Sequence, residues 1–110
     1  MALDLILIDD DELVHLGWKF AAAEDHKTIL CFSSPKDFFL QKDAFDSKTV
    51  IYIDSYLASG VRGEDFAKEL FRLGFENLYL TTGADPSSFG PMPWVRGIVG
   101  KGAPWRKETG

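Results

Sequence analysis

Short apolar runs alternate along the chain with segments of helical periodicity. Residues 3–8, 28–32, 50–53 and 78–80 form four such runs, and residues 95–99 form a weaker fifth. They are almost uniformly apolar, which is typical of strands that helices cover on both faces. Alternating strands and helices build successive βα units around a parallel sheet. The pattern therefore predicts a three-layer α/β fold.

The first predicted helix follows the first apolar run. Its apolar residues recur at steps of three and four, which predicts a single buried stripe. That stripe consists of Leu13, Leu16, Phe20 and Ala23. Acidic residues stand just before it, where they suit the positive start of a helix.

Two further helices have recognisable ends. Ser34 is a capping residue, Pro35 fits the first helical position, and Asp37 completes a capping-box-like pattern. The apolar content of this second helix is Phe38 and Phe39. The third helix starts after Gly63 with Glu64 and Asp65 in its first turn, and it ends at Gly74. Its predicted buried residues are Phe66, Leu70 and Leu73.

Helical periodicity fades after Leu80. Prolines and glycines leave room for only a short fourth helix, and the nine residues after Lys101 are too few and too broken for a full fifth. Helices one and five share one face of a doubly wound sheet, so this face should be partly uncovered. Trp105 is too small to replace a helix, although it can fold back over part of the face. We therefore expect the chain to pair with itself or with an adjoining segment.

The composition fits one soluble domain spanning residues 1–110. The chain is 45% hydrophobic, 14% aromatic and 26% charged. Its net charge of −5 disfavours nucleic acid and anionic membranes as partners. The single cysteine, Cys31, cannot form an internal disulfide and is interpreted as a small core residue. With neither a signal-like start nor an apolar stretch of ~20 residues, a cytoplasmic location is expected.

Three carboxylates, Asp9, Asp10 and Asp11, follow directly on the first apolar run. Like charges this close repel each other, and the usual remedies are a raised pKa or a bound cation. Oxygen-only ligands suit Mg²⁺. The alternative for an acidic pair alone is helix capping by Asp10 or Asp11.

Three more polar residues end later runs. Asp54 ends the third, where the alternative is an ordinary turn aspartate before Ser55. Thr81 ends the fourth and Lys101 follows the fifth; taken singly, these are a strand-end hydroxyl and a surface amine. All of these groups fall at the carboxyl ends of predicted parallel strands, the edge where open α/β sheets bind ligands. Together they supply a metal site, a nucleophile and two groups that neutralise phosphoryl oxygens, as phosphoryl transfer requires.

From about Leu3 to Lys101 the chain resembles the receiver domains of response regulators and hybrid histidine kinases. The resemblance is carried by LILIDDDELV, IYIDSYLASGVRGEDFAKEL, LYLTTGAD and GIVGKGAPW, in that order. It implies a flavodoxin-like fold, with five parallel strands in the order 2-1-3-4-5.

The resemblance also assigns roles to individual residues. Asp9 and Asp10 would hold Mg²⁺, and Asp54 would be the phosphorylated aspartate. The backbone carbonyl of Tyr56 would complete the metal site. Thr81 would reorient toward the phosphoryl group, and Lys101 would pair with it. The implied partner is a histidine kinase or histidine phosphotransfer protein.

The chain departs from the family pattern in three places. Ile98 stands where the family often has an aromatic switch residue, and the sequence Gly102-Ala103-Pro104 follows the lysine in place of an immediate proline. The fourth and fifth helices are reduced or absent. These departures affect the surfaces through which receivers signal, so the resemblance supports the chemistry more strongly than the output.

The expected activity is a self-modifying acceptor with slow self-hydrolysis, which is not a turnover enzyme. One alternative is a haloacid-dehalogenase-like phosphatase with Asp9 as nucleophile and Asp11 as acid. That alternative lacks the Gly-Thr expected after the aspartates and leaves Asp54 unexplained. The other alternative is a pseudo-receiver, which keeps the fold and acts only as a docking module.

Overall fold

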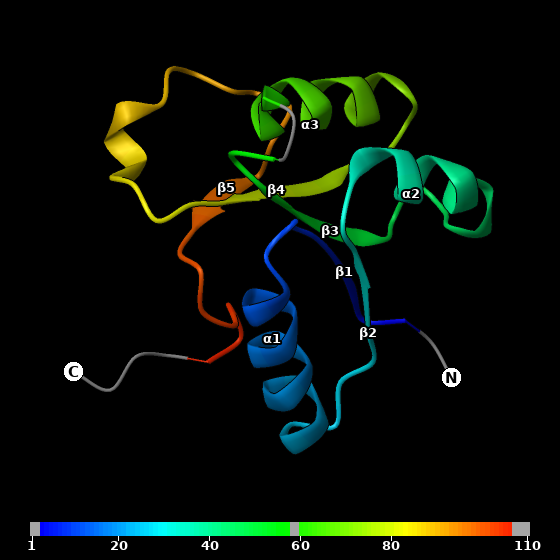
Figure 1. Cartoon of the computed structure of the whole chain (residues 1–110). Coiled ribbons are helices and arrows are strands. Elements are labelled where there is room, and N and C mark those ends of the chain that lie inside the picture. The colour runs from blue at the N-terminus through cyan, green and yellow to red at the C-terminus, as the bar shows by residue number, and fades with distance from the viewer. Residues whose placement is uncertain (1–2, 58–59, 107–110) are drawn as a thin grey trace.

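A computed structural model of the chain describes residues 3–57 and 60–106. Five parallel strands form one sheet in the order β2-β1-β3-β4-β5 (Figure 1), so the predicted order is confirmed. The strands are β1 (Leu5–Ile8), β2 (Ile29–Phe32), β3 (Val50–Asp54), β4 (Asn77–Thr81) and β5 (Gly97–Val99). The register aligns Asp54 with Thr81 and Thr81 with Val99, so the ends of three strands lie side by side.

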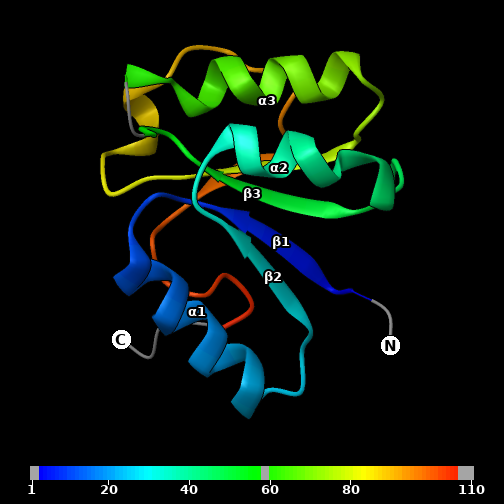
Figure 2. The same ribbon diagram turned by 45° about the vertical axis from the view of Figure 1, so that its right-hand side comes forward.

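Helices cover both faces of the sheet, as the three-layer prediction requires. The α-helices are α1 (Glu12–Glu24), α2 (Pro35–Gln41) and α3 (Gly63–Arg72), and the short 3₁₀ turns are η1 (Lys42–Ala44) and η3 (Pro86–Ser88). Figures 1 and 2 show α2 and α3 on one face and α1 on the other. The larger core lies under α2 and α3, around Phe38, Phe66 and Leu70. None of the helices in the described ranges is long and apolar enough to cross a membrane.

Helix starts follow the capping signals in the sequence. The Ser34 hydroxyl accepts a hydrogen bond from the Asp37 N–H at 3.1 Å, and Pro35 opens α2. Asp11 caps α1 by accepting from the Leu13 N–H at 2.9 Å. Capping therefore accounts for the third aspartate of the acidic run.

The predicted buried stripe of α1 is wrong. Leu13, Leu16 and Phe20 are 77%, 62% and 68% exposed, and Ala23 is exposed too. The buried residues of α1 are His15, Trp18, Ala21 and Ala22. Both sets have helical spacing, so periodicity cannot choose between them. Trp18 decides the orientation of the helix. Its side chain is the largest apolar one in α1, and it packs against Leu5, Leu7 and Tyr52.

One smaller expectation also fails, and another holds in part. Leu73 is half exposed, because α3 ends at Arg72 and Gly74 turns the chain with φ at +104°. Phe75 is buried instead. Cys31 is half-buried and packs against the smaller core cluster that contains Trp18, so it lies at the margin of the core.

The reduced fourth and fifth helices are confirmed within the described residues. Only the turn η3 stands between β4 and β5, and residues 102–106 contain no helix. This tail folds back along α1, where the ring of Trp105 meets Trp18 edge-on at 5.9 Å. Arg106 pairs with Asp25 at 2.7 Å and with Glu24 at 3.0 Å. The tail thus covers part of the face a fifth helix would occupy, and self-association of the chain stays a prediction.

Candidate functional site

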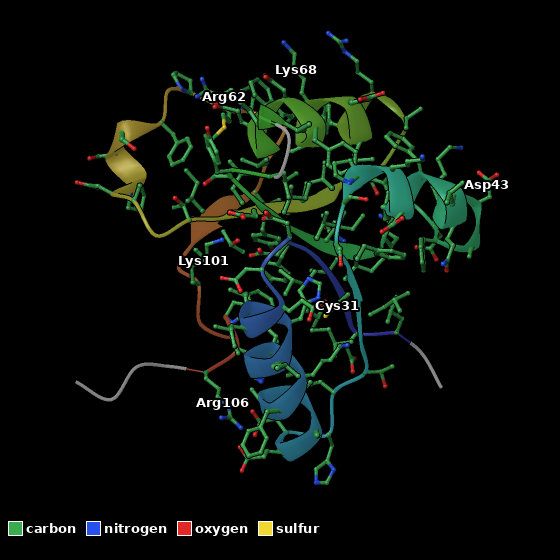
Figure 3. The ribbon with its side chains drawn as sticks, viewed as in Figure 1. Cys31, Asp43, Arg62, Lys68, Lys101 and Arg106 are labelled. Atoms are coloured by element: carbon green, nitrogen blue, oxygen red, sulfur yellow. The ribbon has the colours of Figure 1, made fainter. Side chains whose placement is uncertain are left out.

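The predicted site residues meet at the carboxyl edge of the sheet. Asp9 follows β1, Asp54 ends β3, Thr81 ends β4, and Lys101 stands two residues after β5. Figure 3 shows Lys101 between the end of β5 and the start of α1. Side chains that are up to 92 residues apart in the sequence therefore surround one point.

Three carboxylates form a candidate metal centre. Asp9, Asp10 and Asp54 each offer a carboxylate oxygen, and these oxygens lie within 4.8 Å of one another. Asp9 and Asp54 are buried, whereas Asp10 is exposed. Asp9 is oriented by the Asp11 N–H, which donates to its Oδ1 at 2.8 Å. Hard carboxylate oxygens with one side open to water fit Mg²⁺, which keeps several of its own waters.

Lys101 bridges the two buried carboxylates. Its Nζ donates to Asp54 Oδ1 at 2.6 Å and to Asp9 Oδ2 at 3.0 Å. Burial opposes a charge on this amine, but the hydrogen bonds to Asp54 and Asp9 outweigh it and raise the pKa of Lys101. The lysine is therefore a fixed cation that lowers the repulsion between the two aspartates.

Burial raises the pKa of Asp54 above its ordinary value. The hydrogen bond from Lys101 opposes this rise, and the negative charge of Asp9 adds to it. The backbone N–H of Tyr56 donates to Asp54 Oδ1 at 3.3 Å. A positive charge nearby would therefore stabilise the ionised form of Asp54, and a divalent cation supplies such a charge. The role of the Tyr56 carbonyl as a metal ligand stays a prediction.

Only glycine fits at the start of α3, beside Asp54. A Cβ on Gly63 would lie 1.9 Å from the Asp54 carbonyl oxygen. The Gly63 N–H donates to the Ser55 carbonyl at 3.0 Å, which fixes this close approach. The glycine therefore lets α3 begin directly against the strand end that carries Asp54.

Two neighbouring threonines stand at the carboxyl end of β4: Thr81 is its last residue, and Thr82 follows it. Thr81 is fully buried, and its Oγ1 has no hydrogen-bond partner among the described residues. It pairs in register with Asp54, so both side chains point to the same face of the sheet. Thr82, which the sequence reasoning missed, lines the hollow at Asp54, and its hydroxyl accepts from the Ala84 N–H at 3.0 Å. The signal for Thr82 was the second hydroxyl of the Thr-Thr pair.

An open hollow of about 540 Å³ lies over Asp54. Besides Asp54 and Lys101, its lining includes Thr82, Arg62, Glu64 and Phe89. These residues come from the loops after β3, β4 and β5 and from the start of α3. The hollow therefore gives a solvent-borne group access to a carboxylate that is itself buried.

Two buried residues of α1 form hydrogen bonds with the backbone of site residues. The His15 imidazole, which is 7% exposed, forms a hydrogen bond through Nε2 with the Asp9 carbonyl. The Trp18 indole N–H donates to the Lys101 carbonyl at 2.8 Å. Neither contact was foreseen, because the sequence pattern placed both residues on the exposed side of the helix.

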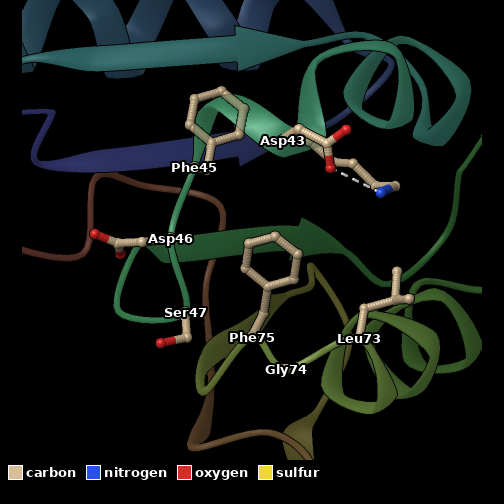
Figure 4. Close-up of a pocket in the computed structure, with 8 residues that line it drawn as sticks. Asp43, Phe45, Asp46, Ser47, Leu73, Gly74 and Phe75 are labelled. Carbon is tan, nitrogen blue, oxygen red and sulfur yellow. Dashed lines mark hydrogen bonds and ion pairs between the residues drawn. The ribbon is translucent and has the colours of Figure 1, made fainter.

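A second hollow, of about 270 Å³, lies at the opposite edge of the sheet (Figure 4). Phe45 and Phe75 face each other across it, and Leu73 lines one side. The Asp43 carboxylate at its rim already pairs with Lys42 at 3.0 Å. Among residues 3–57 and 60–106, Asp43 and Asp46 of this rim belong to no carboxylate cluster of the kind formed around Asp54.

Three solved structures that match this fold are response regulator domains. One is the N-terminal domain of a response regulator/sensory box/GGDEF three-domain protein from Carboxydothermus hydrogenoformans, at 12% identity and a TM-score of 0.73 over 88% of this chain and 80% of that one. A CheY-like receiver domain from Methanospirillum hungatei JF-1 is 19% identical, with a TM-score of 0.65 over 89% and 81%. FixJ-N is 15% identical, with a TM-score of 0.69 over 92% and 82%. No protein-family model and no curated protein sequence matches the chain. The comparisons show the receiver fold, and the site's chemistry follows from its own residues.

Proposed function

We propose that this chain is a phosphoacceptor receiver domain, which takes a phosphoryl group from a phosphohistidine onto Asp54. One observation carries the proposal: the buried Asp54 carboxylate belongs to a cluster of metal-type ligands, pairs with the Lys101 ammonium and lies beneath an open hollow. The receiver fold of the solved structures described above agrees with this chemistry.

The reaction is attack of an Asp54 oxygen on the phosphorus of the donor. The P–N bond to the donor imidazole breaks, a P–O bond to Asp54 forms, and the imidazole leaves with the electron pair. Most of the work is positioning and charge neutralisation. A Mg²⁺ ion held by Asp9, Asp10 and Asp54 would supply two positive charges against the incoming phosphoryl oxygens.

Thr81 and Lys101 act after the transfer. The Lys101 ammonium is already within hydrogen-bond distance of Asp54 and can donate to a phosphoryl oxygen. The unpartnered Thr81 hydroxyl gains an acceptor when the phosphoryl oxygens arrive. Water then hydrolyses the acyl phosphate slowly, so the chain is an acceptor and not a turnover enzyme.

The exposed apolar stripe of α1 supports a protein as the donor. Leu13, Leu16 and Phe20 are mostly exposed, and the stripe begins one turn from the acidic cluster. Nothing lies within 4 Å of the position a Cβ would take on Gly17, so the space over the middle of the stripe is open. An apolar helix can lie against such a surface. A histidine kinase or histidine phosphotransfer protein could then present its phosphohistidine to Asp54.

The phosphatase alternative fits the geometry less well. Its acid, Asp11, is engaged as the N-cap of α1. Its nucleophile, Asp9, is fully buried and does not line the hollow that lies over Asp54. That alternative also gives no role to Asp54.

Mass measurement after incubation with acetyl phosphate and Mg²⁺ tests the proposal. We expect one added phosphoryl group, which Asp54→Asn abolishes and the surface control Asp43→Asn leaves intact. Labelling of the Asp54→Asn protein at Asp9 would favour the phosphatase instead. An unlabelled wild-type chain that still binds Mg²⁺ would favour the docking module.

A further inference from the structure

A second surface feature lies on α3, on the other side of the molecule from α1. Lys68, Phe71 and Arg72 of α3, with Pro93 and Trp94 of the loop before β5, line a groove of about 300 Å³. We call it the α3 groove. Figure 3 shows Lys68 on the outer side of α3, pointing away from the sheet. The groove is at the small end of ligand sites, which span ~300–1,000 Å³, so it has room for about one large side chain.

Two aromatic side chains, Phe71 and Trp94, form the apolar part of the α3 groove. Phe71 is 49% exposed, although aromatic side chains are normally buried. Trp94 is half-buried, and its indole N–H donates to the Glu64 carbonyl at 3.0 Å, which fixes the ring against α3. This hydrogen bond therefore holds Trp94, in the loop before β5, in place as one wall of the groove.

Two cations flank the groove without carboxylate partners. Within the described ranges, neither Lys68 nor Arg72 forms an ion pair. Lys68 lies over the Trp94 ring, with its Nζ 5.1 Å from the ring centroid. Arg72 suits the negative end of α3, but this does not account for Lys68, one turn earlier. On a chain with a net charge of −5, the lining of this groove carries two cations and no carboxylate, although α3 also carries Glu64, Asp65 and Glu69 outside that lining.

We propose that the α3 groove binds a short acidic segment of a partner protein, with one aromatic or aliphatic side chain of that segment in the hollow. Lys68 and Arg72 would each pair with a carboxylate, while Phe71 and Trp94 would contact the apolar side chain. Polyanions such as nucleic acid are disfavoured because the chain as a whole would repel them. A short peptide meets only the local charge, since charges beyond ~10 Å are screened at 0.1 M salt.

Fluorescence anisotropy with a labelled peptide tests the proposal. The probe is fluorescein-labelled Glu-Asp-Glu-Phe-Leu-Asp-Glu, titrated with the protein at 0.1 M salt. We expect saturable binding that weakens about tenfold or more with Lys68→Glu/Arg72→Glu, and also with Phe71→Ser. The matched control is Lys19→Glu/Lys36→Glu, which changes the net charge equally at two other exposed lysines and should leave the affinity within about twofold.

Two control peptides and one control protein complete the experiment. Peptides with the Phe-Leu pair changed to Ser-Ser, or with lysines for the acids, should bind at least about tenfold more weakly. Absence of saturable binding, or equal losses in the groove and control variants, would overturn the proposal. So would self-association that Lys68→Glu/Arg72→Glu abolishes, because the occupant would then be a second copy of the chain. The Asp54→Asn protein should bind the peptide normally, so this inference stands or falls separately from phosphorylation.

Discussion

Trp18 on α1 donates its indole N–H to the main-chain carbonyl of Lys101 at 2.8 Å, across 83 residues of sequence. The same ring is met edge-on by Trp105 from the tail. Lys101 is therefore held at its backbone by α1 while its side chain reaches Asp54 and Asp9. In place of a fifth helix after β5, Trp18 and the short tail with Trp105 hold the backbone of Lys101.

Lys101→Met should destabilise the metal-free protein, because it leaves Asp9 and Asp54 facing each other without a cation. Breaking a buried ion pair costs ~3–5 kcal/mol, and partial exposure of Lys101 reduces this to about 2 kcal/mol of unfolding free energy. Urea denaturation in EDTA measures it. The control Lys48→Met breaks the surface pair with Glu76 and should cost under ~1 kcal/mol. Equal losses in both variants would show that Lys101 does not serve the buried carboxylates.

Mg²⁺ should raise the melting temperature, because it binds the three carboxylates only after folding brings them together. At a hundred times its Kd, the ion adds about 2.7 kcal/mol of stability. Asp10→Asn should melt higher than wild type without metal and lose the Mg²⁺ response. The control Glu69→Gln, at an exposed position of α3, should respond like wild type. An unchanged response in Asp10→Asn would refute the metal site.

The raised pKa of Asp54 should make the free energy of unfolding fall as the pH rises. Its pKa in the folded chain lies above the ordinary value of 3.8, so the folded state holds this proton more tightly than the unfolded state does. The contribution to stability is present at low pH and is lost as pH rises from 3.8 through the folded pKa. Comparing wild type with Asp54→Asn by thermal unfolding in EDTA, from pH 4 to 7, isolates this group. The variant should gain stability relative to wild type as pH rises, and a constant difference would contradict the raised pKa.

Thr81→Val should stabilise the free protein but weaken its stabilisation by a bound phosphoryl mimic. The buried hydroxyl has no partner in the part of the chain that the structure describes, so removing it should raise the unfolding free energy by about 1 kcal/mol. The stabilisation by Mg²⁺ and the phosphoryl mimic beryllium trifluoride should shrink, because the mimic loses its hydroxyl donor. Thr82→Val is the matched control, and it should lower stability by removing the acceptor of the Ala84 N–H. A loss of stability in Thr81→Val would show that the hydroxyl is satisfied in the folded chain.

The sheet and most of the candidate site follow from the sequence. Uniformly apolar runs predicted strands covered on both faces, and the polar residues that end them lie at the carboxyl edge because all strands are parallel. Asp9, Asp54 and Lys101 are therefore close together whatever the details of packing. The caps at Asp11 and Ser34 are equally local, because each depends on residues at most three positions apart.

Only the tertiary structure decided which side of α1 is buried. Leu13, Leu16 and Phe20 have the same helical spacing as His15, Trp18 and Ala22, and the choice depends on which set meets Leu5, Leu7 and Tyr52. Tertiary packing likewise placed Thr82, which follows β4, at the hollow over Asp54, beside the Thr81 that pairs in register with Asp54. Local pattern fixes what a segment can form, whereas contacts between segments that are distant in the sequence fix which of its faces is used.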